Sequence, residues 1–124
     1  ELVELMNRVR QPFNVNHLAQ IAATASLSDK KFIEESRNIN NTGMKQLTDA
    51  FKILNLEFIP SYGNFVSFKL EDEKTAMMYY HHLLNNGVIV RIIANYGLPE
   101  FLRVSVGLEE ENKIFIKYLS NCNI

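Results

Sequence analysis

The chain has 124 residues, of which 47% are hydrophobic and 22% charged, and its formal net charge is −1. This length and composition allow one globular core and exclude disordered, collagenous and disulfide-rich classes. The basic residues are scattered rather than gathered in a stripe, which argues against a nucleic-acid partner. No apolar run approaches the roughly 20 residues that cross a bilayer, so no membrane partner is expected either.

The residues at the two ends of the chain predict its cellular compartment and its place in a longer protein. Cys122 is the single cysteine, so no internal disulfide can form, and a reducing cytoplasm is the consistent compartment. The chain opens on Glu1 without an initiator methionine, and residues 1–11 already have a helical pattern. We therefore expect a segment of a longer, cytoplasmic protein.

Residues 1–27 are expected to form two helices. Pro12 ends the first helix, and Asn14 or Asn16 caps the second. The second helix is apolar on more than one side, so it needs a larger partner surface. We predict that residues 1–27 link this chain to a further domain. The apolar residues of the first helix recur at helical spacing: Leu2, Leu5, Met6, Val9.

A further helical stretch covers residues 30–55, after a cap at Ser28 or Asp29. Gly43 lies in its middle, where a glycine costs about 1 kcal/mol relative to alanine. The pattern leaves open whether residues 30–55 form one helix or two. The apolar face of its C-terminal half is Leu47, Ala50, Phe51, Leu54.

From residue 57 onward the pattern changes to short strands and two more helices. Strands are expected over residues 57–60, 64–70, 88–91 and 101–106. One helix is expected over residues 73–86 and another from Glu109 onward, with Gly87 ending the first. The expected inner faces are Ala76, Met77, Tyr80, Leu83 and Leu84 on the first, and Ile114, Phe115, Tyr118 and Leu119 on the second.

Together these elements predict an α+β domain over residues 28–124. It would hold a small, largely antiparallel sheet of about four short strands, with helices packed on one face. The helices of residues 1–27 would precede it as a linker.

Arg91 and Arg103 are the candidate binding residues. Alternation along residues 101–106 places Arg103 on the face opposite Leu102 and Val104, and the same reasoning places Arg91 opposite Val90. If the two strands are neighbours in matching register, both guanidiniums emerge from one face, and such planar donor forks suit phosphate or carboxylate. The alternative is that each is an ordinary surface or salt-bridged arginine.

Other polar groups carry weaker signals. His81 and His82 are helix neighbours that point about 100° apart, so they cannot easily hold one metal ion, and no metal site is expected. The acidic run Glu109 to Glu111 suits the positive end of a helix dipole. Lys30 and Lys31 fit an exposed first helical turn better than a catalytic role.

Three stretches together resemble one enzyme family. VIVRIIANYGLPEFLRVSVGLEEEN (residues 88–112) resembles the C-terminal signature of histidinol-phosphate aminotransferases. RQPFNVNHLAQIAA (residues 10–23) resembles the segment that links the two domains of that family, and SYGNFVSF (residues 61–68) its Asn-Phe strand. The three stretches occur in the family's order. One departure is Ile92, where the family commonly has proline.

The resemblance implies the small C-terminal domain of a fold type I enzyme that uses pyridoxal 5′-phosphate. Such an enzyme, a homodimer, moves an amino group between L-histidinol phosphate and 2-oxoglutarate in histidine biosynthesis. Arg103 matches the arginine that binds the substrate phosphate or the glutamate carboxylate, and Arg91 a second arginine for the phosphate.

The family's catalytic lysine and its cofactor-binding residues lie upstream of the stretches matched here. This chain is therefore expected to supply no catalytic, cofactor-binding or metal residue and to be inactive alone. Two alternatives remain. One is another fold type I enzyme, such as an aromatic aminotransferase or a threonine-phosphate decarboxylase. The other is a stand-alone α+β module that binds a small anion.

Overall fold

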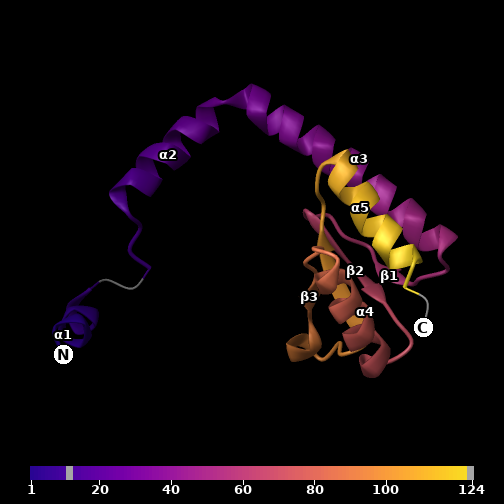
Figure 1. Ribbon diagram of the computed structural model, residues 1–124. Coiled ribbons are helices and arrows are strands. Elements are labelled where there is room, and N and C mark those ends of the chain that lie inside the picture. The colour runs from indigo at the N-terminus through magenta and orange to yellow at the C-terminus, as the bar shows by residue number, and fades with distance from the viewer. Residues whose placement is uncertain (11–12, 123–124) are drawn as a thin grey trace. The chain divides into compact units, whose positions relative to one another are not determined.

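The computed structural model describes residues 1–10 and 13–122, and the chain divides into two compact units (Figure 1). One unit is Glu1–Glu35 and the other is Ser36–Ile124. All strands belong to the second unit. The division at residue 28 that the sequence suggested stays a prediction.

The N-terminal unit consists of exposed helices. These are α1 (Leu2–Val9), α2 (His17–Ser28) and the start of α3 (Lys30–Ile53). Asn16 is the cap of α2, because its side chain accepts a hydrogen bond from the Leu18 N–H at 2.8 Å. Pro12, predicted to end the first helix, lies outside the described residues. No residue of α1 or α2 is buried, so their apolar side chains have no partner surface within this unit.

Helix α3 is continuous through Gly43, which answers the question of one helix or two. Asp29 caps it by accepting a hydrogen bond from the Phe32 N–H at 3.0 Å. Gly43 is buried where the connection after the last strand crosses the helix. A Cβ there would lie 2.5 Å from Val106 Cγ1 and 2.8 Å from Asn112 Nδ2. The glycine therefore permits a close approach rather than a break in the helix.

Four short strands form one antiparallel sheet in the order β1-β2-β4-β3. They are β1 (Phe58–Ile59), β2 (Phe65–Lys69), β3 (Arg91–Ile92) and β4 (Phe101–Ser105). The predicted fold class is confirmed, but each of the four strands is shorter than predicted. The strand expected over 88–91 starts only at Arg91, because the Val88 N–H closes the end of the preceding helix on Leu83 O at 2.9 Å.

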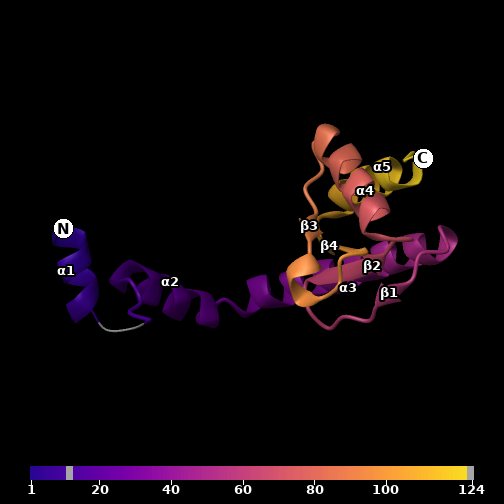
Figure 2. The same cartoon turned by 90° about the horizontal axis from the view of Figure 1, so that it is seen from below.

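One helix between β2 and β3 and another after β4 pack with the C-terminal half of α3 on one face of the sheet. These are α4 (Glu73–Asn85) and α5 (Glu109–Ser120). They lie side by side (Figure 2), joined by a 3.1 Å hydrogen bond between His82 Nε2 and Tyr118 O. Gly87 follows α4 with a φ of +77°, the left-handed conformation predicted for a helix stop.

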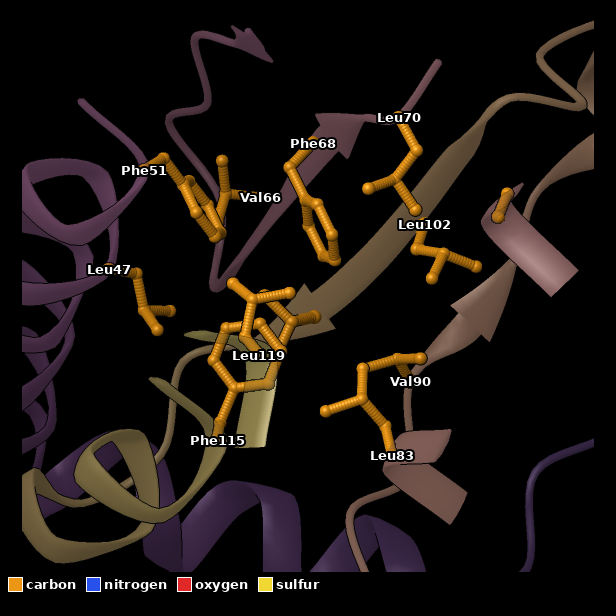
Figure 3. Packing of buried hydrophobic residues seen from close by; sticks show 12 residues of the cluster. Leu47, Phe51, Val66, Phe68, Leu70, Leu83, Val90, Leu102, Phe115 and Leu119 are labelled. Atoms are coloured by element: carbon orange, nitrogen blue, oxygen red, sulfur yellow. The ribbon is translucent and has the colours of Figure 1, made fainter. Parts of the chain in front are cut away.

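The core lies between this sheet face and the three helices (Figure 3). Phe51 of α3 stacks on Phe68 of β2 at 4.9 Å between ring centroids, and Phe115 of α5 meets both rings edge-on. Two predicted inner faces were partly wrong. Leu83 and Phe115 are buried as predicted, but their neighbours Leu84 and Ile114 are 40% and 50% exposed, because α4 and α5 turn these two side chains away from the core. Met77, Tyr80 and Tyr118 are half-buried.

Candidate functional site

The strand register brings the two predicted arginines together. Arg91 of β3 is the direct cross-strand partner of Arg103 in β4, and Ser67 of β2 faces Arg103 from the other side. Leu102 and Val104 point the opposite way, into the core. Both arginines thus lie at one level on the sheet face away from the core, as the alternation predicted.

Each guanidinium lies near an aromatic ring. The Arg103 guanidinium carbon is 4.5 Å from the centroid of the Phe65 ring, and that of Arg91 is 5.9 Å from the Tyr96 ring. Within residues 1–10 and 13–122, no carboxylate forms a salt bridge with either arginine. The salt-bridged alternative therefore does not describe these two side chains in the part of the chain that the structure covers.

Two like charges facing each other across a strand pair are unfavourable. An anion placed between or above them would convert that repulsion into attraction, and each planar fork can donate two parallel hydrogen bonds to it. Arg91 is exposed and Arg103 half-buried, so both are accessible from this face. The arrangement is chemically suited to a phosphate or a carboxylate.

The connection between β3 and β4 brings Tyr96 beside Arg91. It contains a short 3₁₀ turn, Ala94–Tyr96, which ends at Gly97 with a φ of +77°. Ile92, at the position where the resembling family has proline, pairs with Leu102 in the ladder. The departure from the family pattern therefore lies inside the strand pairing.

The other polar candidates lie apart from the arginines. His81 is exposed on α4, while His82 bonds to α5. Among the described residues no group of three or more histidine, cysteine, aspartate or glutamate side chains is placed to hold a metal ion. Burial raises the pKa of the Cys122 thiol, which disfavours the nucleophilic thiolate there.

The acidic run Glu109 to Glu111 opens α5, as predicted. The Glu111 carboxylate accepts a hydrogen bond from the Leu108 N–H at 2.7 Å. Glu109 and Glu110 both pair with Lys113, which lowers the pKa of the Glu109 carboxyl and raises that of Lys113. These carboxylates cap and stabilise a helix.

The described lysines do not fit a pyridoxal-phosphate site. A lysine that binds this cofactor covalently must be desolvated or otherwise activated. Every lysine of the chain is exposed except Lys69, which is half-exposed and lies 3.8 Å from Glu57. Lys30 and Lys31 are exposed in the first turn of α3, and Lys31 pairs with Glu35. Their surroundings thus offer none of the burial that such a lysine needs.

A buried polar network, which the sequence did not reveal, secures the end of β4. Asn112 is 2% exposed and donates from Nδ2 to Gln46 Oε1 at 3.0 Å and to Gly107 O at 3.1 Å. Its Oδ1 accepts from the Gly107 N–H at 3.0 Å. This asparagine ties the connection after β4 to helix α3. The only sequence signal was its place at the end of an acidic stretch.

Comparison with known proteins agrees with this architecture. The family model described as aminotransferase class I and II matches residues 1–119. The chain belongs to this aminotransferase family. Among the described residues, no helix combines the length and the apolar character needed to cross a membrane.

The chain is also similar to particular members of the family. It is 52% identical to a histidinol-phosphate aminotransferase of Methylobacillus flagellatus, over 95% of this chain and 31% of that protein. It is 51% identical to histidinol-phosphate aminotransferase 2 of Ralstonia nicotianae, over 98% of this chain and 33% of that protein. It thus spans about a third of the length of the curated relatives it matches.

A solved structure shows the same fold. It is the histidinol-phosphate aminotransferase of Sinorhizobium meliloti in complex with pyridoxal-5′-phosphate, with a TM-score of 0.80 and 20% identity. The match covers 96% of this chain and 33% of that one. The likeness shows that this chain shares the fold of about a third of that solved structure.

Proposed function

We propose that this chain is the C-terminal part of a histidinol-phosphate aminotransferase. Relatives that carry this name are about half identical to the chain, over almost its whole length. That name also favours histidinol phosphate over the substrates of an aromatic aminotransferase or a threonine-phosphate decarboxylase. In this proposal residues 28–124 are the small domain, and residues 1–27 link it to the rest of the enzyme. The unburied helices α1 and α2 support the second point.

The pairing of Arg91 with Arg103 on the open sheet face is the observation that carries the proposed mechanism. In the mechanism Arg103 binds the phosphate of L-histidinol phosphate or, in the other half of the reaction, a carboxylate of 2-oxoglutarate or glutamate. Arg91 assists with the phosphate. One cationic face can serve both substrates because an aminotransferase binds them in turn.

Anchoring the remote anion contributes to rate as well as to affinity. A substrate held at its phosphate has its amine fixed in one place, and such positioning can supply much of the rate gain of an enzyme. The bidentate geometry of arginine also fixes the orientation of the bound group, which a lysine would not. The contribution of this chain is thus binding and orientation.

The chemistry of amino transfer would come from pyridoxal 5′-phosphate, which acts as an electron sink when bound. Because the described lysines do not fit it, we propose that the remainder of the enzyme holds the cofactor and that this chain alone is inactive. We further propose that the complete enzyme is a cytoplasmic homodimer that acts in histidine biosynthesis.

The coding sequence upstream of Glu1 tests this proposal. A continuous reading frame that encodes the remaining two thirds of an aminotransferase, including a lysine near its C-terminal end, would support it. An initiation codon immediately before Glu1 would contradict it and favour the stand-alone anion-binding module. A purified full-length protein that fails to transaminate L-histidinol phosphate with 2-oxoglutarate would contradict the proposed substrates.

A further inference from the structure

The side chain of Phe65 lies on the same sheet face as the two arginines. In the ladder Ser67 faces Arg103 and Phe65 faces Ser105, so Phe65 and Arg103 are diagonal neighbours. Long and aromatic side chains reach each other at this diagonal. The Arg103 guanidinium carbon lies 4.5 Å from the ring centroid, well inside the roughly 6 Å limit of a cation–π interaction.

The ring of Phe65 takes no part in the hydrophobic core. It is 36% exposed and stands apart from the cluster that Val66 and Phe68 join on the opposite face. Arg103 in turn has no hydrogen bond or salt bridge from its guanidinium among the described residues. The aromatic ring is therefore the contact that the structure records for this guanidinium.

The backbone around Phe65 is held firmly. The Val106 N–H donates to Asn64 O at 2.8 Å, and Asn40 of α3 donates from Nδ2 to Gly63 O at 3.1 Å. Phe65 itself is paired with Ser105 at the end of the β2–β4 ladder. The ring thus stands on a fixed base, so it can restrict where the arginine lies.

The contact with Phe65 directs the Arg103 side chain toward β2. Arg103 leans from β4 toward β2, whereas the like-charged Arg91 lies on β3, on the other side of β4. Arg91 has its own ring, Tyr96, but at 5.9 Å this contact is at the limit of the interaction. A guanidinium resting by its face on a ring keeps the N–H donors at its edge available for an anion.

We propose that Phe65 is a positioning residue for Arg103. The ring holds the guanidinium away from Arg91 and in an orientation suited to an anion. A carboxylate in the place of the ring would also hold the guanidinium, but it would compete with the anion for its N–H donors. This inference rests on the proposed function of Arg103. It adds a specific requirement: an aromatic ring at position 65, rather than apolar bulk, sets the affinity of the arginine face.

The test compares Phe65→Leu, Phe65→Met and Phe65→Tyr in the full-length protein that contains this chain. The readouts are KM and kcat for L-histidinol phosphate, and the affinity for inorganic phosphate from isothermal titration calorimetry. Leu and Met should each raise KM and weaken phosphate binding by about three- to tenfold, with kcat changed less. The Tyr variant keeps the ring and should restore both values. Tyr62→Leu removes a fully exposed ring from the same connection and is the matched control.

A double-mutant cycle separates positioning from a structural effect. In the Arg103→Ala background Phe65→Leu should have no further effect on KM, because no guanidinium is left to position. An undiminished effect in that background, or wild-type KM and phosphate affinity in both the Leu and Met variants, would overturn the inference. Wild-type behaviour of Arg103→Ala itself would instead refute the proposed function of that arginine.

Discussion

The buried glycine of α3 gives a prediction whose sign is opposite to ordinary helix propensity. Replacing a glycine by alanine inside an unconstrained helix stabilises it by about 1 kcal/mol. At Gly43 the new Cβ would lie 2.5 Å from Val106 Cγ1, 2.8 Å from Asn112 Nδ2 and 3.2 Å from Gly107 O. Because carbon atoms prefer about 3.5–4.0 Å, the nearest neighbour must move by about 1 Å.

Those neighbours are poorly able to move. Asn112 is held by hydrogen bonds to Gln46 and Gly107, so displacing it breaks a buried network. Overpacking of this kind costs about 1–3 kcal/mol, and the cost exceeds the gain in propensity. After the propensity gain is subtracted from this cost, we expect Gly43→Ala to lower the free energy of unfolding by up to about 2 kcal/mol.

Urea unfolding followed by circular dichroism measures this effect. Asn41→Ala, at an exposed position of the same helix, is the matched control and should leave stability unchanged or slightly raised. Adding Val106→Ala removes the closest contact, so Gly43→Ala should cost less in that background than in the wild type. A Gly43→Ala protein that is about 1 kcal/mol more stable than the wild type would refute the close approach.

Three further predictions concern stability. Asn112→Ala leaves Gly107 and Gln46 without their hydrogen-bond partner and should lower the free energy of unfolding in urea by about 1–3 kcal/mol. An unchanged midpoint would show that this network does not stabilise the fold. Phe51→Ala opens a cavity among three aromatic rings and should cost about 3–5 kcal/mol; a loss below about 1 kcal/mol would contradict the packing in Figure 3. Asp72 accepts the Thr75 N–H at 2.7 Å, which lowers the pKa of its carboxyl below 3.8. A lowered folded-state pKa stabilises the protein above the unfolded value, so Asp72→Ala should be destabilising at pH 7. The difference should shrink as the pH falls below about 4 through the lowered folded-state pKa, and a difference independent of pH would contradict this cap.

The elements that sequence periodicity predicted well are those in which apolar and polar residues alternate clearly along the chain. Alternation along residues 64–70 and 101–106 identified β2 and β4 and assigned their faces. The third strand was predicted over residues 88–91 but begins only at Arg91, because the Val88 N–H closes the end of α4 instead of pairing with β4. The hydrophobic pattern cannot show whether a backbone N–H bonds to the end of a helix or to a neighbouring strand.

The site was predictable only in part, for a similar reason. Alternation assigned a sheet face to Arg103 and Arg91, but it could not show that they are cross-strand partners, because the pairing register of β3 and β4 is known only from the structure. Phe65 is part of the site because it is a diagonal neighbour across β2 and β4, and Asn112 is buried because α3 crosses the end of β4. From the sequence, Gly43 was a weak point of a helix; in the structure it is required because the connection after β4 packs closely against α3 there.

The central claim is that Arg103 and Arg91 together bind the anionic groups of both substrates. Its most direct test is the KM of Arg103→Ala and Arg91→Ala full-length protein for L-histidinol phosphate and for 2-oxoglutarate. We expect Arg103→Ala to raise KM for both substrates by about 10- to 100-fold, as loss of a charge-assisted hydrogen bond predicts. Arg91→Ala should affect L-histidinol phosphate more than 2-oxoglutarate. Wild-type KM values for both substrates in both variants would contradict the account.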